Sequence, residues 1–371
     1  MDLNFYMPVR VFSGTGCLSA QFDKVAALGR RCLIVTGQHG ARESGALDAA
    51  LQLCRQYKVE ATVYPDIPAN PLLSRCVTAA QAVQTVRAQF VFGIGGGSVL
   101  DAAKVIAWLA ANRPEDTDGL YARTLRCAPL PCVLVGTTAG TGSEVTAVSV
   151  LTVDATGRKK SVTDPRLYAR YAFADAAYTA SLPREQAVST ALDALCHAAE
   201  GMLSPLCEEA PMLFAEKALS LLGHGMPALC GPEPPDAAAR QALLYGSIWA
   251  GLVINQTGTA FPHPMGYILT EQYGVPHGMA SAVFLPALLR RAGAFTPMRL
   301  MRLYRAFGGG DALADVLEAL VRCDVRMTPE QIEAQRERLT GCKHYARTPG
   351  GFDERLALQT LYEVCGPEAE R

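Results

Sequence analysis

The sequence predicts an α/β protein in which an N-terminal, Rossmann-like domain with a parallel sheet is followed by an all-α helical domain. Three observations support this prediction. The 371 residues are enough for two domains of ordinary size. Short apolar runs alternate with helical stretches through the first half, which is the pattern of a parallel sheet covered by helices on both faces. This alternation ends near Ser181-Leu182-Pro183, so we expect domains at 1–182 and 183–371.

The apolar runs of the first half are expected to form strands at roughly 32–36, 59–64, 89–93 and 131–136. Helices are expected between them at about 45–57 and 70–87, and from Ser98 onward. Asn70 and Pro71 resemble the cap and the first residue of the second of these helices. Residues 148–153 and 161–162 are expected to pair as a hairpin across the turn at 154–157.

The second half shows helical periodicity and almost no strand signal. We expect its helices at roughly 184–202, 208–222, 236–257, 278–292, 311–323 and 353–364. Each half is long enough to bury a core of its own.

Composition and charge exclude several kinds of partner. The chain is 50% hydrophobic and 19% charged, with a formal net charge of -1. Its longest basic run is Arg158-Lys159-Lys160, so we expect no nucleic-acid partner. We see neither a signal peptide nor an apolar stretch that could span a bilayer, so we expect no membrane partner. Twelve cysteines without a C-x-x-C pair indicate reduced thiols in a cytoplasmic protein.

A glycine-rich turn, Gly95-Gly96-Gly97-Ser98, joins the third apolar run to a helix. Consecutive glycines let the backbone approach a ligand, and a helix N-terminus favours a phosphate. Ser98 is expected to cap the helix, with Asp101 answering it in a variant of the capping box. Ser98 occupies the place of the third glycine of G-x-G-x-x-G, so a tight turn without a ligand stays open as an alternative.

A second loop, from Gly136 to Glu144, follows another apolar run and is dense in glycine and hydroxyl groups. Such a loop suits a pyrophosphate or a ribose. One loop of this kind would be weak support, but two at the ends of two strands of one sheet indicate a dinucleotide.

A carboxylate and three imidazoles suggest a metal site in the helical half. Asp193 and His197 stand at i and i+4 of a predicted helix, so both side chains can reach one ion. His263 and His277 follow in the stretches 263–267 and 276–278. This donor set suits Fe(II), Zn(II) or a similar ion, and the residues alone do not choose among them.

The remaining three histidines carry less information. His39 follows the first strand, where a cofactor ribose could lie. His224 and His344 are expected to be ordinary hydrogen-bonded residues.

These motifs, in this order, resemble the signatures of the iron-containing alcohol dehydrogenase family. The stretches concerned run over 95–104, 137–146, 193–201 and 276–278, so the resemblance covers nearly the whole chain. It implies a metal-dependent alcohol dehydrogenase or aldehyde reductase that transfers a hydride between a small alcohol and NAD or NADP. It also implies a homodimer.

The resemblance assigns residues one by one. The metal ligands fall on Asp193, His197, His263 and His277, with an ion that is usually Fe(II) and sometimes Zn(II). The dinucleotide contacts fall on Gly96, Gly97, Ser98, Thr137, Thr138, Thr141 and Lys159, with Asn70 as a weaker candidate. It follows that 1–182 is expected to bind the dinucleotide and 183–371 the metal, and no further catalytic side chain is assigned.

Two departures from the family pattern matter. Some members carry a second histidine four residues after the third ligand, where this chain has Tyr267, which could pass a proton or could be an aromatic wall. The run Thr36-Gly37-Gln38-His39-Gly40 lacks the acidic residue that holds the adenosine ribose in many NAD-using members. An acid there would repel a 2′-phosphate, so its absence leaves NADP open.

Two relatives with the same two-domain plan remain as alternatives, namely glycerol dehydrogenase and the lyase dehydroquinate synthase. The lyase needs a phosphate-binding pocket rich in Lys and Arg in the helical half. The sequence around the ligand motifs shows no such cluster.

Overall fold

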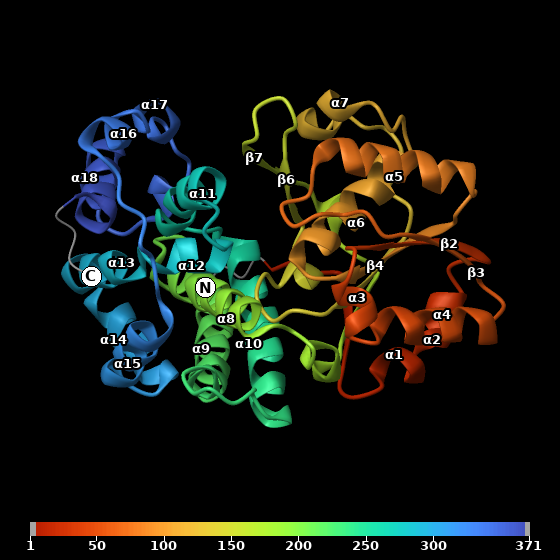
Figure 1. The fold of residues 1–371 in the computed structure, drawn as a ribbon, viewed down its shortest axis with the longest axis horizontal. Coiled ribbons are helices and arrows are strands. Elements are labelled where there is room, and N and C mark those ends of the chain that lie inside the picture. Colours follow the sequence, from red (N-terminus) through yellow and green to blue (C-terminus); the bar gives the residue numbers. More distant parts are fainter. Residues whose placement is uncertain (1–4, 368–371) are drawn as a thin grey trace. The chain divides into compact units, whose positions relative to one another are not determined.

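The computed structural model describes residues 5–367, and the chain divides into two compact units at Pro183 and Arg184 (Figure 1). The first unit, Tyr6–Pro183, is built on a six-stranded parallel sheet of order β1-β8-β5-β4-β2-β3. Its strands are β1 (Arg10–Ser13), β2 (Arg31–Thr36), β3 (Glu60–Tyr64), β4 (Phe90–Gly95), β5 (Cys132–Gly136) and β8 (Tyr171–Ala174). The predicted Rossmann-like parallel sheet is therefore confirmed, with the four expected strands at its centre and at one edge.

The predicted hairpin is also present. Strand β6 (Val148–Thr152) pairs antiparallel with β7 (Lys159–Thr163) in a separate two-stranded sheet. The sequence did not predict β1 and β8. Each is only four residues long; β8 is an apolar run of just that length, and β1 has polar residues at both ends.

Alternate residues of the sheet enter two separate hydrophobic clusters, as expected when successive side chains point to opposite faces. Leu33, Val35 and Val91 belong to one cluster, and Ile34 and Phe92 belong to the other. Helices α1 (Cys17–Ala20), α2 (Phe22–Ala26) and α4 (Ala46–Gln56) cover the face of Ile34 and Phe92. The cluster of Leu33, Val35 and Val91 lies on the opposite face, so both faces of the sheet are buried. Burial on both faces explains the apolar sequence of the central strands.

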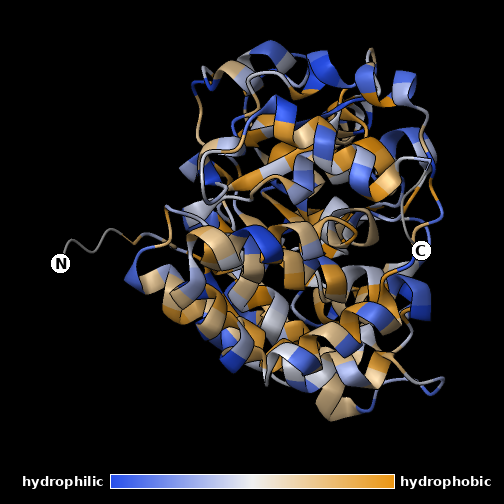
Figure 2. Cartoon of the chain, turned by 90° about the vertical axis from the view of Figure 1, so that its left-hand side faces the viewer, coloured by the Kyte–Doolittle hydropathy of each residue, from blue (hydrophilic) through white to orange (hydrophobic). Residues whose placement is uncertain are grey.

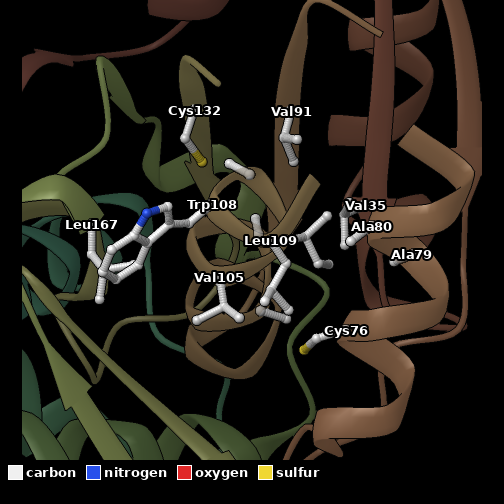
Figure 3. Close-up of a cluster of buried hydrophobic side chains, with 14 of the residues drawn as sticks. Val35, Cys76, Ala79, Ala80, Val91, Val105, Trp108, Leu109, Cys132 and Leu167 are labelled. Carbon is white, nitrogen blue, oxygen red and sulfur yellow. The ribbon is translucent and has the colours of Figure 1, made fainter. Parts of the chain in front are cut away.

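The opposite face is covered by α5 (Leu73–Thr85) and α6 (Gly97–Ala110). Figure 3 shows Trp108 and Leu109 of α6 in this cluster, with Ala79 and Ala80 of α5 and Val35 of the sheet nearby. Helix α6 is buried along most of its length, and its first residue follows directly on the turn after β4. The core packing therefore fixes the position of the glycine-rich turn.

The start of α5 was predicted wrongly. The helix begins at Leu73, and Asn70 adopts a left-handed backbone conformation with φ of 56°. The intervening Leu72 forms a bridge with Thr152 of β6 instead of joining the helix. Asn70 and Pro71 therefore belong to a loop that runs beside the hairpin.

The second unit consists of helices, and no strand follows β8 in the part of the chain that the structure describes. The principal helices are α8 (Arg184–Leu203), α9 (Glu209–Gly225), α10 (Ala237–Thr257), α11 (Pro262–Tyr273), α12 (His277–Ala282), α13 (Leu285–Phe295), α14 (Pro297–Phe307), α15 (Gly310–Leu320) and α18 (Glu354–Cys365). The expected helix at 278–292 is two helices, α12 and α13, and the sequence did not predict α11 and α14. Both unpredicted helices begin at a proline, which is favourable at a first helical position but interrupts a hydrophobic pattern.

Helix α8 lies at the centre of this unit and is buried from Val188 to its end apart from one residue. It packs against α9, α10 and α12. Among the described residues α10 alone is long and apolar enough to cross a membrane, yet it packs along α8 and α9 as a core helix does. Figure 2 shows many helices coloured orange on one part of their surface and blue on another, as expected when one face is buried.

Candidate metal centre

One face of helix α8 carries three buried polar side chains in an otherwise apolar surrounding. Asp193, His197 and Glu200 are spaced so that they lie on one side of the helix. Their exposed fractions are 3%, 6% and 0%. Burying such groups is costly unless they are paired or bind an ion, so this face indicates a site.

The three predicted histidine ligands converge on one atom of the fourth, Oδ1 of Asp193. This oxygen lies 3.6 Å from Nε2 of His197, 3.5 Å from Nε2 of His263 and 3.8 Å from Nε2 of His277. Ligand atoms of Asp193, His263 and His277 all lie within 4.8 Å of one another. Helices α8, α11 and α12, which supply these residues, lie together in Figure 1.

A glycine permits the approach of α12 to α8. A Cβ atom on Gly278 would stand 1.8 Å from the carbonyl oxygen of Ser189 and 2.8 Å from the backbone nitrogen of Asp193. Both distances are far below van der Waals contact, so only glycine lets the start of α12 lie this close to α8. His277 precedes this glycine as the first residue of α12, which places its ring beside Asp193.

Glu200 orients one of the imidazoles. Nδ1 of His263 donates a hydrogen bond to Oε1 of Glu200 at 2.6 Å, and the backbone N–H of Ala260 donates to Oε2 at 2.7 Å. With Nδ1 donating, Nε2 of His263 faces Asp193 and can act as a ligand. Glu200 was not predicted as a site residue. Its spacing of seven residues from Asp193, on a helix of apolar residues, is the signal that could have identified it.

The charges in this cluster shift one another's protonation. Burial by itself raises the pKa of Asp193, but the imidazoles of His197, His277 and His263 outweigh it and hold that pKa well below its usual range. Burial opposes a charge on His263, yet Glu200 and Asp193 raise its pKa to about 10. Burial also raises the pKa of Glu200 against the lowering effect of His263. The site therefore holds an ionised carboxylate and favours positive charge beside it.

These residues fit a divalent ion. Oδ1 of Asp193 and Nε2 of His263 are buried, and neither has a hydrogen bond of good geometry to any described residue. Buried polar atoms are normally satisfied, so such a pair needs an explanation. A tetrahedral ion with bonds of about 2.1 Å holds its ligand atoms about 3.4 Å apart. The separations of 3.5 to 3.8 Å from Oδ1 of Asp193 are close to that value.

The other histidines lie outside this cluster. Nδ1 of His344 bonds the carbonyl oxygen of Thr259 at 2.9 Å, and burial lowers the pKa of His344 to about 3. Nδ1 of His224 lies 2.5 Å from the carbonyl oxygen of Ser220, one turn earlier in α9. Both are hydrogen-bonded residues, as expected from the sequence. His39 is exposed directly after β2, immediately before the short helix α3 (Gly40–Glu43).

In the α/β unit, the two predicted phosphate loops lie side by side and interlock. Strands β4 and β5 pair so that Gly95 stands opposite Gly136, and the N–H of Thr137 donates to the carbonyl oxygen of Gly95 at 3.0 Å. A Cβ on Gly96 would lie 2.9 Å from Cγ2 of Thr138, and one on Gly97 would lie 2.2 Å from Cγ2 of Thr141. These glycines are therefore required for contact between the loops.

The remaining predicted nucleotide residues adjoin these loops. The backbone N–H of Asn70 donates to Oγ of Ser98 at 3.3 Å. Thr152 donates from Oγ1 to the carbonyl oxygen of Asn70 at 3.4 Å and stands opposite Lys159 in the hairpin. The predicted glycine, serine and threonine residues thus lie in the loops that follow β4 and β5, at the carboxyl ends of these strands, where parallel sheets bind ligands. Asn70 is bonded to Ser98, and Lys159 is linked to this region through Thr152 of the hairpin.

The predicted cap of helix α6 is wrong. The helix begins without a side-chain cap from any described residue, and Asp101 instead accepts hydrogen bonds from Oγ of Ser143 at 2.5 Å and from the N–H of Val150 at 2.8 Å. The buried ammonium of Lys104 lies 3.1 Å from Asp101 and donates to the carbonyl oxygen of Ser143. Asp101 and Lys104 therefore anchor the second phosphate loop to α6 in place of capping the helix.

Comparison with protein families agrees with the geometry of both units. The model described as iron-containing alcohol dehydrogenase matches residues 8–176, and that of the C-terminal domain of the same family matches 187–339. Among curated relatives, long-chain-alcohol dehydrogenase 1 of Geobacillus thermodenitrificans is 32% identical over 352 residues, which cover 94% of this chain and 86% of that protein. The 1-propanol dehydrogenase PduQ of Salmonella typhimurium is 31% identical over 280 residues, which cover 75% of this chain and 70% of that protein.

Solved structures show the same similarity. The iron-containing alcohol dehydrogenase of Thermotoga maritima superposes with a TM-score of 0.89 at 33% identity, over 98% of this chain and 99% of that chain. The sulfoacetaldehyde reductase of Bifidobacterium kashiwanohense, solved in complex with NAD+, superposes with a TM-score of 0.86 at 25% identity, over 98% and 99% of the two chains. The chain therefore belongs to the iron-containing alcohol dehydrogenase family and is an oxidoreductase, a metal-dependent alcohol dehydrogenase.

Proposed function

We propose that this enzyme interconverts a small alcohol and its aldehyde, with one divalent ion held by Asp193, His197, His263 and His277. The observation that carries the proposal is the convergence of three imidazoles on Oδ1 of Asp193, a buried atom without a hydrogen bond of good geometry to a described residue. A donor set of three nitrogens and one oxygen suits Fe(II), which the family description favours, and is also compatible with Zn(II). Such an ion supplies Lewis-acid polarisation of a substrate oxygen when bound.

The residues of the chain hold the proposed ligand atoms in position before an ion binds. Asp193 contributes the negative charge that retains a cation in a buried site. Glu200 keeps Nδ1 of His263 engaged, so that Nε2 stays directed at the same point as the other donors. All four proposed ligands lie on helices, which hold a site more precisely than loops do.

The metal assignment is tested by His277→Ala, with His224→Ala as a control on the surface of the same unit. We expect the first variant to lose its bound ion and its turnover together, because it removes one of four donors. The control should retain both, since the hydrogen bond that His224 makes among the described residues lies within its own helix. Full metal content in His277→Ala, measured by elemental analysis after anaerobic loading with Fe(II) or Zn(II), would overturn the assignment.

For the redox partner we propose a nicotinamide dinucleotide bound by the interlocked loops after β4 and β5, which supplies or accepts the hydride. Support comes from the glycine and hydroxyl content of these loops, from their place at the carboxyl ends of the strands, and from the NAD+ complex of the sulfoacetaldehyde reductase. We propose NAD(H) as a cofactor and expect NADP(H) to be accepted as well, because Gly37 stands where an acid would repel a 2′-phosphate.

This preference can be tested by comparing Gly37→Asp with Gly37→Ala. A Cβ at this position would lie 3.2 Å from the carbonyl oxygen of Ile67, so both variants share the same tight contact and differ in charge. Repulsion at a partly desolvated site of ~1–3 kcal/mol should shift the NAD/NADP ratio of kcat/KM about tenfold or more in the aspartate variant alone. An equal shift in both variants, or a parent that rejects NADPH, would contradict this reasoning.

The substrate is proposed only as a class. The curated relatives are named for alcohols that range from 1-propanol to long-chain alcohols, so a panel of short and long aldehydes tests the range. Net NAD(P)H oxidation distinguishes the dehydrogenase from a lyase of the same two-domain plan, which shows none. We further propose a cytoplasmic homodimer; the twelve cysteines, all within the described residues and all free thiols, are consistent with a reducing compartment.

A further inference from the structure

Tyr267 lies against one of the proposed metal ligands. It stands one helical turn after His263 on α11, and its ring stacks on the imidazole of His277, with centroids 5.3 Å apart and planes inclined by 22°. The edge of His263 meets the same imidazole, at 5.4 Å and 77°. His277 is therefore held by two aromatic rings that both come from α11.

The side chain of His277 is the most exposed of the four proposed ligands. Its side chain is 27% exposed, compared with 3% for His263 and 5% for Asp193. It is also the first residue of α12, a helix of six residues. Packing and Glu200 hold His263 in place, and the ring contacts with Tyr267 and His263 restrict the ring plane of His277.

The two roles that the sequence left open for Tyr267 can be separated by this geometry. Hydrogen bonds to an imidazole nitrogen lie in the plane of the ring. A phenol that stacks on the face of His277 is therefore poorly placed to exchange a proton with its nitrogens. A stacked ring instead restricts rotation of the imidazole, at the scale of an aromatic pair.

We propose that Tyr267 is a positioning residue for the metal centre: its ring face holds the imidazole of His277 so that Nε2 points at Oδ1 of Asp193. This inference rests on the proposed function, because it assumes that His277 binds the ion. Helix α11 then supplies the proposed ligand His263 and, one turn later, Tyr267, which supports the proposed ligand His277. The aromatic face is the part required, so phenylalanine should serve as well as tyrosine.

The experiment compares Tyr267→Phe with Tyr267→Leu in the full chain, and Tyr273→Leu serves as control at the exposed end of the same helix. Binding of Co(II) is measured by competition with a chromophoric chelator, and the visible spectrum of the bound ion reports its ligand geometry. We expect the leucine variant to bind Co(II) about threefold to tenfold more weakly, with an altered spectrum and faster extraction by chelator, on the scale of one lost aromatic pair. The phenylalanine variant and the control should stay within about twofold of the parent. If the leucine variant is unstable, Tyr267→Met, whose flexible side chain also lacks an aromatic ring but adapts to irregular spaces, repeats the test.

Two results would overturn the inference. One is a leucine or methionine variant with parental affinity and spectrum, and the other is a phenylalanine variant as weak as the leucine variant, which would assign the effect to the hydroxyl group. The variant His277→Ala distinguishes failure of the positioning role of Tyr267 from failure of the proposed metal centre. If it loses Co(II) while Tyr267→Leu retains it, the metal centre stands and the positioning role fails. If it also retains Co(II), both fail.

Discussion

Replacement of Glu200 by glutamine tests whether this carboxylate acts on the proposed metal centre or only on the fold. The change keeps the shape of the side chain and removes one of its two acceptor oxygens. In the parent, Oε1 accepts from Nδ1 of His263 at 2.6 Å and Oε2 accepts from the N–H of Ala260 at 2.7 Å. Glutamine can satisfy one of these donors, and its amide group then faces the other.

The expected loss of metal affinity in Glu200→Gln can be estimated from the lost acceptor oxygen. A buried donor left without an acceptor costs about 1–3 kcal/mol, and Glu200 is fully buried. If the amide faces His263, the imidazole loses the bond that directs Nε2 toward Asp193. If it faces Ala260, the segment that leads into α11 must shift. Removal of a carboxylate that supports a ligating histidine typically weakens metal binding by about 10- to 100-fold, and we expect a loss on that scale.

The assay measures two quantities in the same variant. Competition with a chelator gives the dissociation constant for Zn(II) or Co(II), and urea unfolding of the metal-free protein gives its stability. Glu216→Gln serves as control, because that carboxylate pairs with Arg302 on the surface of the same unit. A Glu200→Gln variant that loses stability but binds the ion with parental affinity would refute the positioning role that we assign to Glu200.

Two further predictions follow from close contacts and from burial. Gly278→Ala should lower both metal affinity and stability, the latter by about 1–3 kcal/mol, because its Cβ would overlap the carbonyl oxygen of Ser189; elemental analysis and thermal unfolding measure the two effects, and unchanged metal content would contradict the account. Burial raises the pKa of Glu144 from 4.5 to about 6, so the folded state binds this proton more tightly and stability falls as pH rises between these values, by about 2 kcal/mol. Glu144→Gln should therefore stabilise the protein at pH 8 and not at pH 4.5, and equal effects at both pH values in urea unfolding would refute this.

Local sequence patterns predicted the centre of the sheet and the edge formed by β3, but not the edge formed by β1 and β8. Strands β2, β4 and β5 are buried on both faces, so their sequences are continuous apolar runs that stand out. Strands β1 and β8 have only four residues each. The apolar run of β8 is therefore short, and β1 is partly exposed and produces no such run. Their pairing joins residues that are about 160 positions apart, and no local pattern reports a contact over that separation.

The glycines of the turn after β4 have a structural reason as well as a possible ligand-binding one. The sequence suggested that Gly96 and Gly97 leave room for a phosphate, but the positions of their missing Cβ atoms are next to Thr138 and Thr141. Contact between two loops that are far apart in the chain therefore requires these glycines before any ligand is considered. A motif shows where a side chain is absent, and only the fold shows what fills the space.

The proposed metal centre shows the same difference between local patterns and tertiary contacts. The spacing of Asp193 and His197 is a helical pattern that a sequence displays directly, and the later histidines stand in short motifs. The contacts that bring these residues together are tertiary: Gly278 lets α12 reach α8, and a Cβ on Gly266 of α11 would lie 2.9 Å from the backbone nitrogen of Ser281 in α12. Because backbones in van der Waals contact leave little freedom for sliding, close packing of the three helices restricts the positions of the proposed ligand atoms. A substitution at either glycine should therefore affect the ion without touching a ligand.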